Sequence, residues 1–401
     1  MIKIDIIKYV LRNLKRRKLR TSLTALSIFI GVTTIFIFVS FGLGLYNYIN
    51  ELSQGSSIDK VIIQQKGIVV PGSNKNFQLT DKDLELIKRV PGVYEVTPII
   101  ISPIEIQKND EKYYPSLIAY DPLNNFIFDI SNVKVEKGRE LRREDKNKIL
   151  LGNSYKKENK IFSKPFDVNQ KILVNKEEFI IIGFLEEIGS PQDDAQVYIT
   201  IDKAKELFPN KTGYDWLIAK VDLKEIDSII DKITETLRKE KNQKKGEEDF
   251  FVQSFNDLIR SYSSALNIII GFVILIALFS VIVSAINTSN TMISSILERY
   301  REIGVMKSIG AKNSEILLIF LIESALVGFF AGLIGIFFGF VISFIGGKIL
   351  SSLGWGFLKP LFSIWLFLFC ILFSTFTGAI AGVLPAYKAS KINPVEALRY
   401  E

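Results

Sequence analysis

The sequence predicts a membrane protein with four transmembrane α-helices and a large α+β extracytoplasmic domain between the first and the second. The first observation is composition: 48% of the residues are hydrophobic while 23% are charged, which is typical of membrane segments joined to a soluble domain. The second is a set of four apolar runs, each longer than the roughly 20 residues that cross a bilayer core. The third is the placement of charge, because the basic excess lies in short segments that flank these runs.

Residues 1–20 are predicted to form a cytoplasmic amphipathic elbow helix ahead of the first span. They hold eight Lys and Arg residues against a single acid, Asp5. By the positive-inside rule the N-terminus is therefore cytoplasmic, and residues 21–50 form the first span, TM1. Residues 51–260 then lie outside, and they hold 33 basic and 36 acidic residues, without the basic excess of the flanking segments.

Residues 51–260 are predicted to form the extracytoplasmic α+β domain, with insertions at 121–153 and 187–196 that divide it into two subdomains. Runs of β-branched residues predict strands at 61–63, 99–101 and 178–184. Thr80 and Asp83 have the spacing of a capping box, which predicts a helix that begins there. An amphipathic helix packed on the sheet is indicated by Ile226, Ile230, Ile233 and Leu237.

Three further spans follow the domain. Residues 261–297 form TM2, and because 37 helical residues reach about 55 Å against a core of about 30 Å, the surplus is expected to project as a stalk. The remaining segments are a coupling helix at 298–313, TM3 at 314–347, an outer loop at 348–360, TM4 at 361–387 and a cytoplasmic tail at 388–401.

Small residues in TM3 and TM4 predict close helix packing, since glycines four residues apart let transmembrane backbones approach each other. The pairs are Gly328 with Gly332, Gly335 with Gly339, and Gly378 with Gly382. Packing of TM3 on TM4 within one chain is the favoured interpretation, and packing against another subunit is the alternative.

Glu323 interrupts the apolar run of TM3, where a charge is costly unless it is paired or hydrated. It fits either an ion or proton site or a helix–helix tie to a basic residue such as Arg20 or Arg299. The tie is the favoured interpretation.

The coupling helix has a charged surface that is expected to dock another protein. Gly310 is expected to end it, while Ile303, Val305, Met306 and Ile309 are expected to supply apolar contacts. The candidate docking residues are Glu298, Arg299, Tyr300, Arg301, Glu302, Lys307 and Gly310. Reversing Arg299 and Arg301 to Glu is expected to abolish docking while leaving membrane insertion intact.

Composition also excludes several functions. The chain has no histidine, so it has no histidine general base or histidine metal ligand. Its single cysteine, Cys370, lies in TM4, so the extracytoplasmic domain has no disulfide. No catalytic motif is found, and we assign no catalytic residue and no metal ligand. The net charge of +7 follows the membrane topology and does not indicate nucleic-acid binding.

Three motifs resemble the MacB/FtsX-type permease family of ABC transporters, the type VII or mechanotransmission class. The most specific is Glu-Arg-Tyr-Arg-Glu-Ile-Gly-Val-Met-Lys-Ser-Ile-Gly-Ala at 298–311, and the others lie at 12–24 and 385–398. Looser matches in the domain include Leu79-Thr-Asp-Lys-Asp, Pro91-Gly-Val, Gly138-Arg-Glu-Leu and Asp202-Lys-Ala. The resemblance covers essentially the whole chain.

The resemblance implies that two permeases pair with two ATPase subunits and that ATP-driven closure moves the extracytoplasmic domain. This chain lacks the Gly-x-x-x-x-Gly-Lys-Ser/Thr phosphate loop, so the ATPase is expected to be a separate polypeptide, unlike the fused N-terminal ATPase of MacB. ATP and Mg²⁺ are then expected on that partner, with no cofactor bound directly by the permease.

The leading hypothesis is a permease in the cell membrane, with both termini cytoplasmic, that exports or extracts a substrate. MacB-like efflux and LolC/LolE-like lipoprotein release both fit. The expected partners are the ATPase, a second permease copy or paralogue and membrane lipid, with an extracytoplasmic adaptor as a further candidate. The alternative is a mechanotransmitter that regulates an outer hydrolase or signalling protein without transport, and an anchored enzyme is the least favoured class.

Overall fold

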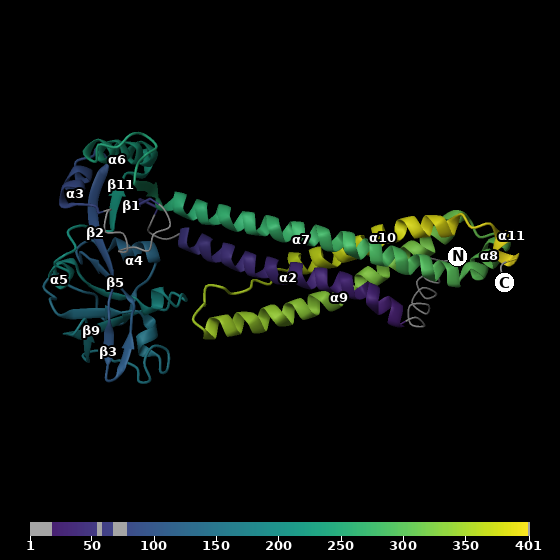
Figure 1. Ribbon diagram of the computed structural model, residues 1–401, viewed down its shortest axis with the longest axis horizontal. Coiled ribbons are helices and arrows are strands. Elements are labelled where there is room, and N and C mark those ends of the chain that lie inside the picture. Colours follow the sequence, from purple (N-terminus) through teal and green to yellow (C-terminus); the bar gives the residue numbers. More distant parts are fainter. Residues whose placement is uncertain (1–17, 54–57, 67–77, 400–401) are drawn as a thin grey trace. The chain divides into compact units, whose positions relative to one another are not determined.

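The computed structural model describes residues 18–53, 58–66 and 78–399, which form two compact units (Figure 1). The membrane unit contains residues 18–45, Ala265–Ile349 and residues 359–399. The extracytoplasmic unit contains the described residues of Tyr46–Ser264, together with Leu350–Leu358. Most of the elbow helix expected at 1–20 lies outside the described residues.

Four long helices build the membrane unit, each with a stretch that is long and apolar enough to cross a membrane. They are α2 (Lys18–Ser53), α7 (Phe255–Glu298), α9 (Asn313–Ser352) and α10 (Ile364–Ser390). The predicted fold class, four spans with a large domain between the first two, is confirmed. The 36 residues of α2 and 44 of α7 exceed the length of a bilayer core, and their outermost turns belong to the extracytoplasmic unit.

The glycine pairs of α9 face two different helices of the same chain. Its first pair meets α10: a Cβ on Gly378 would lie 2.5 Å from the Ser324 carbonyl oxygen and 3.0 Å from Gly328 Cα. Gly332 and Gly382 likewise face serine side chains of the opposite helix, Ser374 and Ser324. Because no side chain fits between them, the two helices pack backbone to backbone.

The second pair of α9 faces α2 instead. A Cβ on Gly335 would lie 3.1 Å from the Phe29 carbonyl oxygen, and one on Gly339 would lie 3.0 Å from the Cβ of the fully buried Phe36. Thr33 Oγ1 also donates to the Gly335 carbonyl oxygen over 3.1 Å, which ties the same two helices. The small residues of α9 therefore position both α10 and α2.

The extracytoplasmic unit is built on a twelve-stranded mixed sheet among the described residues. The strands in chain order are β1 (Lys60–Gln65), β2 (Val93–Pro103), β3 (Ile106–Lys108), β4 (Glu111–Tyr113), β5 (Ser116–Tyr120), β6 (Val135–Gly138), β7 (Lys148–Leu151), β8 (Lys171–Val174), β9 (Glu177–Leu185), β10 (Val197–Thr200), β11 (Trp216–Val221) and β12 (Phe250–Ser254). They pair in the order β12-β1-β11-β2-β5-β10-β7-β9-β8-β3-β4, with β6 beside β9. The strands predicted at 61–63, 99–101 and 178–184 are confirmed as parts of β1, β2 and β9.

The eleven-residue strand β2 belongs to both halves of this sheet (Figure 1). Its first part, Val93–Ile99, pairs with β11, and Ile100–Pro103 pairs with β5. A single hydrophobic cluster includes Val61 of one half and Phe179 of the other. The pairing thus divides the domain into two halves, but the halves share one core.

Four helices, α3 (Asp81–Lys88), α4 (Phe126–Ser131), α5 (Ile201–Leu207) and α6 (Ile226–Glu240), accompany the sheet. The predicted capping box at α3 is confirmed, since the Thr80 N–H donates to Asp83 Oδ2 over 2.8 Å and the Asp83 N–H donates to Thr80 Oγ1 over 3.3 Å. In α6 the fully buried side chains are Ile229, Ile233 and Leu237, so the packed face is turned slightly from the predicted one.

The loop Leu350–Leu358, which joins α9 to α10, folds with the extracytoplasmic unit. The Phe357 N–H donates to the Gly189 carbonyl oxygen over 3.3 Å, and Lys160 Nζ donates to the Ser352 carbonyl oxygen over 2.9 Å. The Phe357 and Tyr48 rings lie 5.6 Å apart. This loop, predicted only as a connection, is therefore part of the domain.

Candidate functional site

The charged segment between α7 and α9 forms a short separate helix, α8 (Tyr300–Ser308). Its chain direction changes at Arg299, where α7 has ended. Gly310 follows α8 with a φ of +99°, a conformation that L side chains rarely adopt, and its N–H donates to the Lys307 carbonyl oxygen over 3.0 Å. The prediction that Gly310 ends this helix is confirmed.

One face of α8 is buried against the ends of the long helices. Ile303 is fully buried in a cluster with residues of α7, α9 and α10, namely Met292, Ile296, Ile316, Phe320, Ala386 and Ala389. Gly304 faces α11 (Pro394–Arg399), where a Cβ would lie 2.6 Å from the Cβ of Ala397. Lys307 Nζ donates to the Ile392 carbonyl oxygen over 2.8 Å. The C-terminal segment thus covers part of α8, and α8 and α11 lie close together in Figure 1.

The opposite face of α8 is exposed and carries both charge and apolar surface. It consists of Arg301, Glu302, Val305, Ser308 and Ile309, which we call the α8 stripe. These positions are spaced as i, i+1, i+4, i+7 and i+8, so they share one side of the helix. Val305 is 45% exposed and Ile309 is 81% exposed. The two exposed aliphatic side chains beside charges make this face a candidate for contact with another protein.

The four residues expected to supply apolar contacts do not share one face of the helix. Ile303 is buried and Met306 is half-buried, whereas Val305 and Ile309 are not packed. Helical geometry explains the difference, because Ile303 and Val305 are two residues apart and cannot face the same way. Helical periodicity counted from Ile303 as a buried residue would have predicted the α8 stripe from the sequence.

Arg299 is one of the candidate docking residues, but its side chain is only 3% exposed and does not lie on the α8 stripe. Its Nη1 donates to Glu323 Oε2 over 3.1 Å, and its Nε donates to Glu302 Oε2 over 3.2 Å. The guanidinium also lies 5.3 Å from the centroid of the Phe320 ring. Arg299 is therefore a structural tie, and of the two interpretations of Glu323 the geometry matches the helix–helix tie.

The other candidate docking residues divide by exposure. Glu298, Arg301, Glu302 and Gly310 are exposed, while Tyr300 and Lys307 are half-buried. Lys307 contacts the C-terminal segment through its ammonium group, so its charge is only partly available to a partner. Sequence alone missed the packing of α11 on α8, although Gly304 between large neighbours was a signal for close approach.

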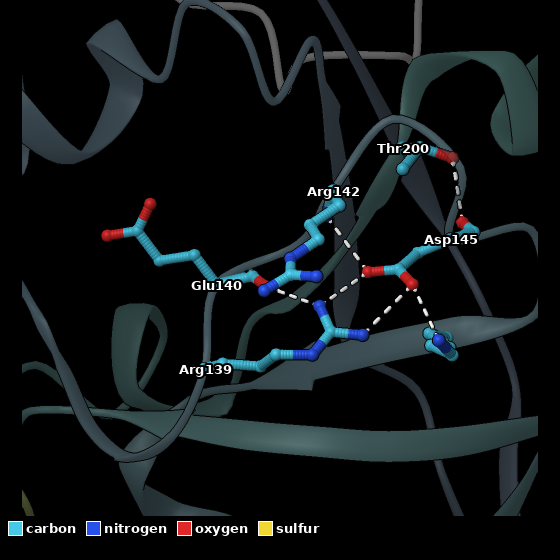
Figure 2. Close-up of polar contacts among 6 residues, drawn as sticks. Arg139, Glu140, Arg142, Asp145 and Thr200 are labelled. Atoms are coloured by element: carbon cyan, nitrogen blue, oxygen red, sulfur yellow. Dashed lines mark hydrogen bonds and ion pairs between the residues drawn. The ribbon is translucent and has the colours of Figure 1, made fainter.

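A second polar cluster, in the extracytoplasmic unit, is centred on Asp145 (Figure 2). Arg139 donates to both carboxylate oxygens of Asp145 over 2.7 and 3.0 Å, and Lys148 Nζ donates over 2.7 Å. The Arg142 N–H donates over 2.9 Å, and Thr200 Oγ1 donates to the Asp145 carbonyl oxygen over 3.4 Å. These contacts connect the loop after β6 to the start of β7 and the end of β10.

Burial alone would raise the pKa of Asp145, but the hydrogen bonds from Arg139, Lys148 and Arg142 outweigh it and hold the pKa well below its ordinary value. A carboxylate that is fully bonded and permanently ionised is suited to hold loops together and is not suited to proton transfer. The Gly138-Arg-Glu-Leu motif thus has a structural explanation: Gly138 has a φ of +91° and Arg139 binds Asp145.

Two sequence families match the chain. Residues 21–236 match the family described as MacB-like periplasmic core domain, and residues 274–394 match the family described as FtsX-like permease C-terminal. Together the two matches include α8, α9 and α10, most of α2, more than half of α7 and most of the sheet.

Relatives match along the whole chain. An uncharacterized ABC transporter permease of Methanocaldococcus jannaschii is 33% identical over 99% of this chain and 98% of its own length. The uncharacterized ABC transporter permease YknZ of Bacillus subtilis is 27% identical over 98% of both chains. The macrolide export ATP-binding/permease protein MacB of Brucella melitensis is 28% identical over 99% of this chain, which spans 60% of that protein.

Two solved structures are similar to the extracytoplasmic part. The periplasmic region of MacB from Actinobacillus actinomycetemcomitans covers 53% of this chain and 97% of its own, with a TM-score of 0.43 and 18% identity. The extracellular domain of the transporter YknZ covers 49% of this chain and all of its own, with a TM-score of 0.38 and 16% identity.

Proposed function

The chain belongs to the MacB/FtsX family of ABC transporter permeases, and from this premise we propose that it is a subunit through which a separate ATPase moves the extracytoplasmic domain. The observation that carries the proposal is the α8 stripe. It combines two charged and two exposed aliphatic side chains on a helix whose other face is anchored to three of the membrane-spanning helices. A push on such a helix is passed directly to the spans that it contacts.

Relatives of two kinds support a separate ATPase. The two relatives matched over 98% of their own length are named permeases, whereas MacB, of which 60% is matched, is named an ATP-binding/permease protein. The present sequence has no phosphate loop of its own. We place ATP and Mg²⁺ on the partner, and we assign no cofactor to the permease.

The proposed assembly has two permease chains, identical or paralogous, and two ATPase subunits. Positive charge near the ends of the spans supports an orientation in which α8 and both termini are cytoplasmic. The ATPase would then meet the α8 stripe from the aqueous side, where no lipid covers Val305 and Ile309.

The proposed reaction is export or extraction of a substrate on the outer side of the membrane. Support comes from the name of the MacB relatives, which describes macrolide export. MacB-like efflux and release of a lipid-anchored substrate, as in LolC/LolE-type subunits, share the same mechanical requirement. In both, domain movement, and not passage of the substrate between the spans, performs the work.

The proposal is tested by co-expressing the permease with a candidate phosphate-loop ATPase from the same organism and substituting Ile309→Asp. A carboxylate in place of an exposed aliphatic anchor is expected to abolish co-purification and permease-dependent ATP hydrolysis. Leu223→Asp is the matched control, because Leu223 is a 52% exposed aliphatic residue of the extracytoplasmic unit. Full co-purification and hydrolysis with Ile309→Asp would rule out docking on the α8 stripe.

Transport is separated from regulation in vesicles that contain the complex. An outer ligand that stimulates ATP hydrolysis and is released on turnover supports export or extraction. Stimulation only by a bound hydrolase or sensor protein would replace transport with the regulatory alternative.

A further inference from the structure

One side of α7 is left largely uncovered by the rest of the described chain. Only 12% of the apolar window of α7 is buried, compared with 44% for α2. Residues separated by three or four positions share one side of a helix. On the uncovered side of α7 these are Phe272, Ile276, Phe279, Val283, Asn287, Asn290, Ser294 and Leu297, which we call the α7 stripe.

The α7 stripe changes in chemistry along its length. In the half toward the start of α7 it is apolar, and Phe272, Phe279 and Val283 are 62%, 68% and 55% exposed. Lipid tails cover such side chains as well as protein does, so they do not by themselves indicate a partner. In the half toward α8 the stripe carries two exposed amide side chains, Asn287 and Asn290.

Both amides lie within the membrane-spanning part of α7. At 1.5 Å per residue, Asn287 and Asn290 are about 16 and about 12 Å from Glu298, the last residue of the helix, against a bilayer core of about 30 Å. In α9 and α10 no amide side chain follows Asn313, the first residue of α9. The exposed amides are therefore a feature of α7 that these two spans do not share.

Lipid cannot cover these two amides as it covers the apolar half of the stripe. Neither amide makes a side-chain hydrogen bond within the described part of the chain. The nearby hydroxyls differ, because Thr291 and Ser294 donate to the backbone carbonyl oxygens of Asn287 and Asn290 over 2.9 and 3.2 Å. Polar groups that face hydrocarbon without a hydrogen bond are costly, so the amides call for a partner of their own.

We propose that a second copy of this chain packs on the α7 stripe, with Asn287 and Asn290 bonded to the same residues of that copy. An amide complements an identical amide, because its N–H group donates and its carbonyl oxygen accepts. Two copies inserted in the same direction are related by a twofold axis along the membrane normal, so identical residues meet at equal depth. A charged side chain at these positions would face a like charge, whereas an amide does not.

This inference rests on the proposed function, which calls for two permease chains, and it assigns their contact to one helix. Lipid can replace the apolar contacts of the stripe but not the amide bonds. The amides therefore fix the depth and the rotation of each α7 in the pair, as a polar residue fixes register in a coiled coil. Because α7 leads into α8, the two α8 stripes would lie on either side of the same axis.

Disulfide cross-linking of the full chain in liposomes, with copper phenanthroline as oxidant and no ATPase present, tests the proposal. Cys370→Ala removes the only natural cysteine, and Val283→Cys places a new one on the stripe, one turn from Asn287. Ile282→Cys is the matched control, because Ile282 and Val283 are both 55% exposed at the same depth but point about 100° apart. We expect a cross-linked dimer with Val283→Cys and little with Ile282→Cys. No dimer with Val283→Cys, or an equal yield at both positions, would overturn the proposal.

A further variant tests the amides themselves. In the Val283→Cys chain, Asn287→Leu with Asn290→Leu removes the proposed bonds, so the same yield of dimer should need roughly tenfold more protein per lipid. Asn267→Leu is the matched control, because Asn267 is also an exposed asparagine of α7 but lies nearly opposite the stripe. An unchanged yield in the double variant would contradict the role of the amides.

The cross-linking result is independent of ATPase docking. If the proposed function fails, Ile309→Asp still co-purifies with the ATPase. If this inference fails, the Val283→Cys chain does not form a specific dimer when no ATPase is present. Thermal unfolding of the reduced variants is expected to match that of the Cys370→Ala chain, because the other substituted side chains are exposed.

Discussion

Arg299 and Glu323 form an ion pair whose Nη1 and Oε2 atoms lie 3.1 Å apart, with side chains only 3% and 8% exposed. Glu323 belongs to α9, and Arg299 stands where the chain passes from α7 to α8. The pair therefore fixes the base of α8 to a membrane-spanning helix. Burying either charge alone among the membrane-spanning helices would cost free energy, and their pairing offsets this cost.

Breaking this pair is expected to destabilise the membrane unit. Glu323→Gln leaves Arg299 with Glu302 as its remaining carboxylate, at 3.2 Å, and the loss of a buried partner typically costs about 3–5 kcal/mol. The free energy of unfolding, measured by denaturant titration of the full chain in detergent, checks this loss. The double variant Arg299→Met with Glu323→Leu is the control, and it is expected to recover most of the loss because it leaves neither position with a buried charge, while Glu302 is exposed to solvent. Equal stability of Glu323→Gln and the unmodified chain would contradict a structural role.

Arg299 and Arg301, which flank Tyr300, are expected to behave differently. Arg301→Glu changes an exposed charge on the α8 stripe, so it should weaken ATPase association while the melting temperature stays unchanged. Arg299→Glu places a third carboxylate beside Glu323 and Glu302, so it should lower the melting temperature in the absence of any ATPase. Co-purification and thermal unfolding of both variants separate the two roles. Identical profiles would show that the burial of Arg299 does not matter.

Close packing of α9 on α10 makes Gly378 sensitive to a single methyl group. Gly378→Ala would place Cβ 2.5 Å from the Ser324 carbonyl oxygen, and overpacking of this kind costs about 1–3 kcal/mol. Gly271→Ala in α7 is the matched control, because no atom lies within 4 Å of its Cβ and alanine favours a helix. Denaturant titration should show a loss only for Gly378→Ala. A comparable loss of stability in Gly271→Ala would mean that the replacement of glycine by alanine, and not close helix packing, causes the effect.

Asp145 gives the extracytoplasmic unit a defined dependence on pH. Because its pKa is held well below the ordinary value of 3.8, its bonds stabilise the fold above that value and are lost as the pH falls through the lowered pKa. Asp145→Asn removes this contribution, so the variant should be less stable near neutral pH, and the difference should shrink in strong acid. Urea titration of both proteins near pH 7 and near pH 3 checks the sign, since below the ordinary pKa of 3.8 the unfolded chain binds a proton at Asp145 that the folded chain does not. A gap that widens in acid would contradict the assignment.

The fold followed from sequence because its signals are strong and local. Length and apolarity define the four spans, and the pairs of glycines identify the close helix contacts. The Thr80 and Asp83 cap is equally local, since both partners lie within four residues.

The candidate site was only partly predictable, because its decisive contacts join distant parts of the chain. Composition indicates a charged helix at 298–313 but does not show which charges are buried. The burial of Arg299 depends on Glu323, 24 residues away, and that of Lys307 depends on Ile392, 85 residues away.

The loop Leu350–Leu358 makes the extracytoplasmic domain discontinuous in sequence. A fragment cut from the chain at Tyr46 and Ser264 would lack two hydrogen-bond partners. These are the Ser352 carbonyl oxygen, which accepts from Lys160, and the Phe357 N–H, which donates to the Gly189 carbonyl oxygen. The surface that the loop covers in the intact protein would then be exposed. If this domain were exchanged between relatives without the loop, the residues that Lys160 and Gly189 contact would no longer match it. The loop and the turn that follows Ile188 should therefore change together as the family diversifies, because they contact each other although they lie far apart in the sequence.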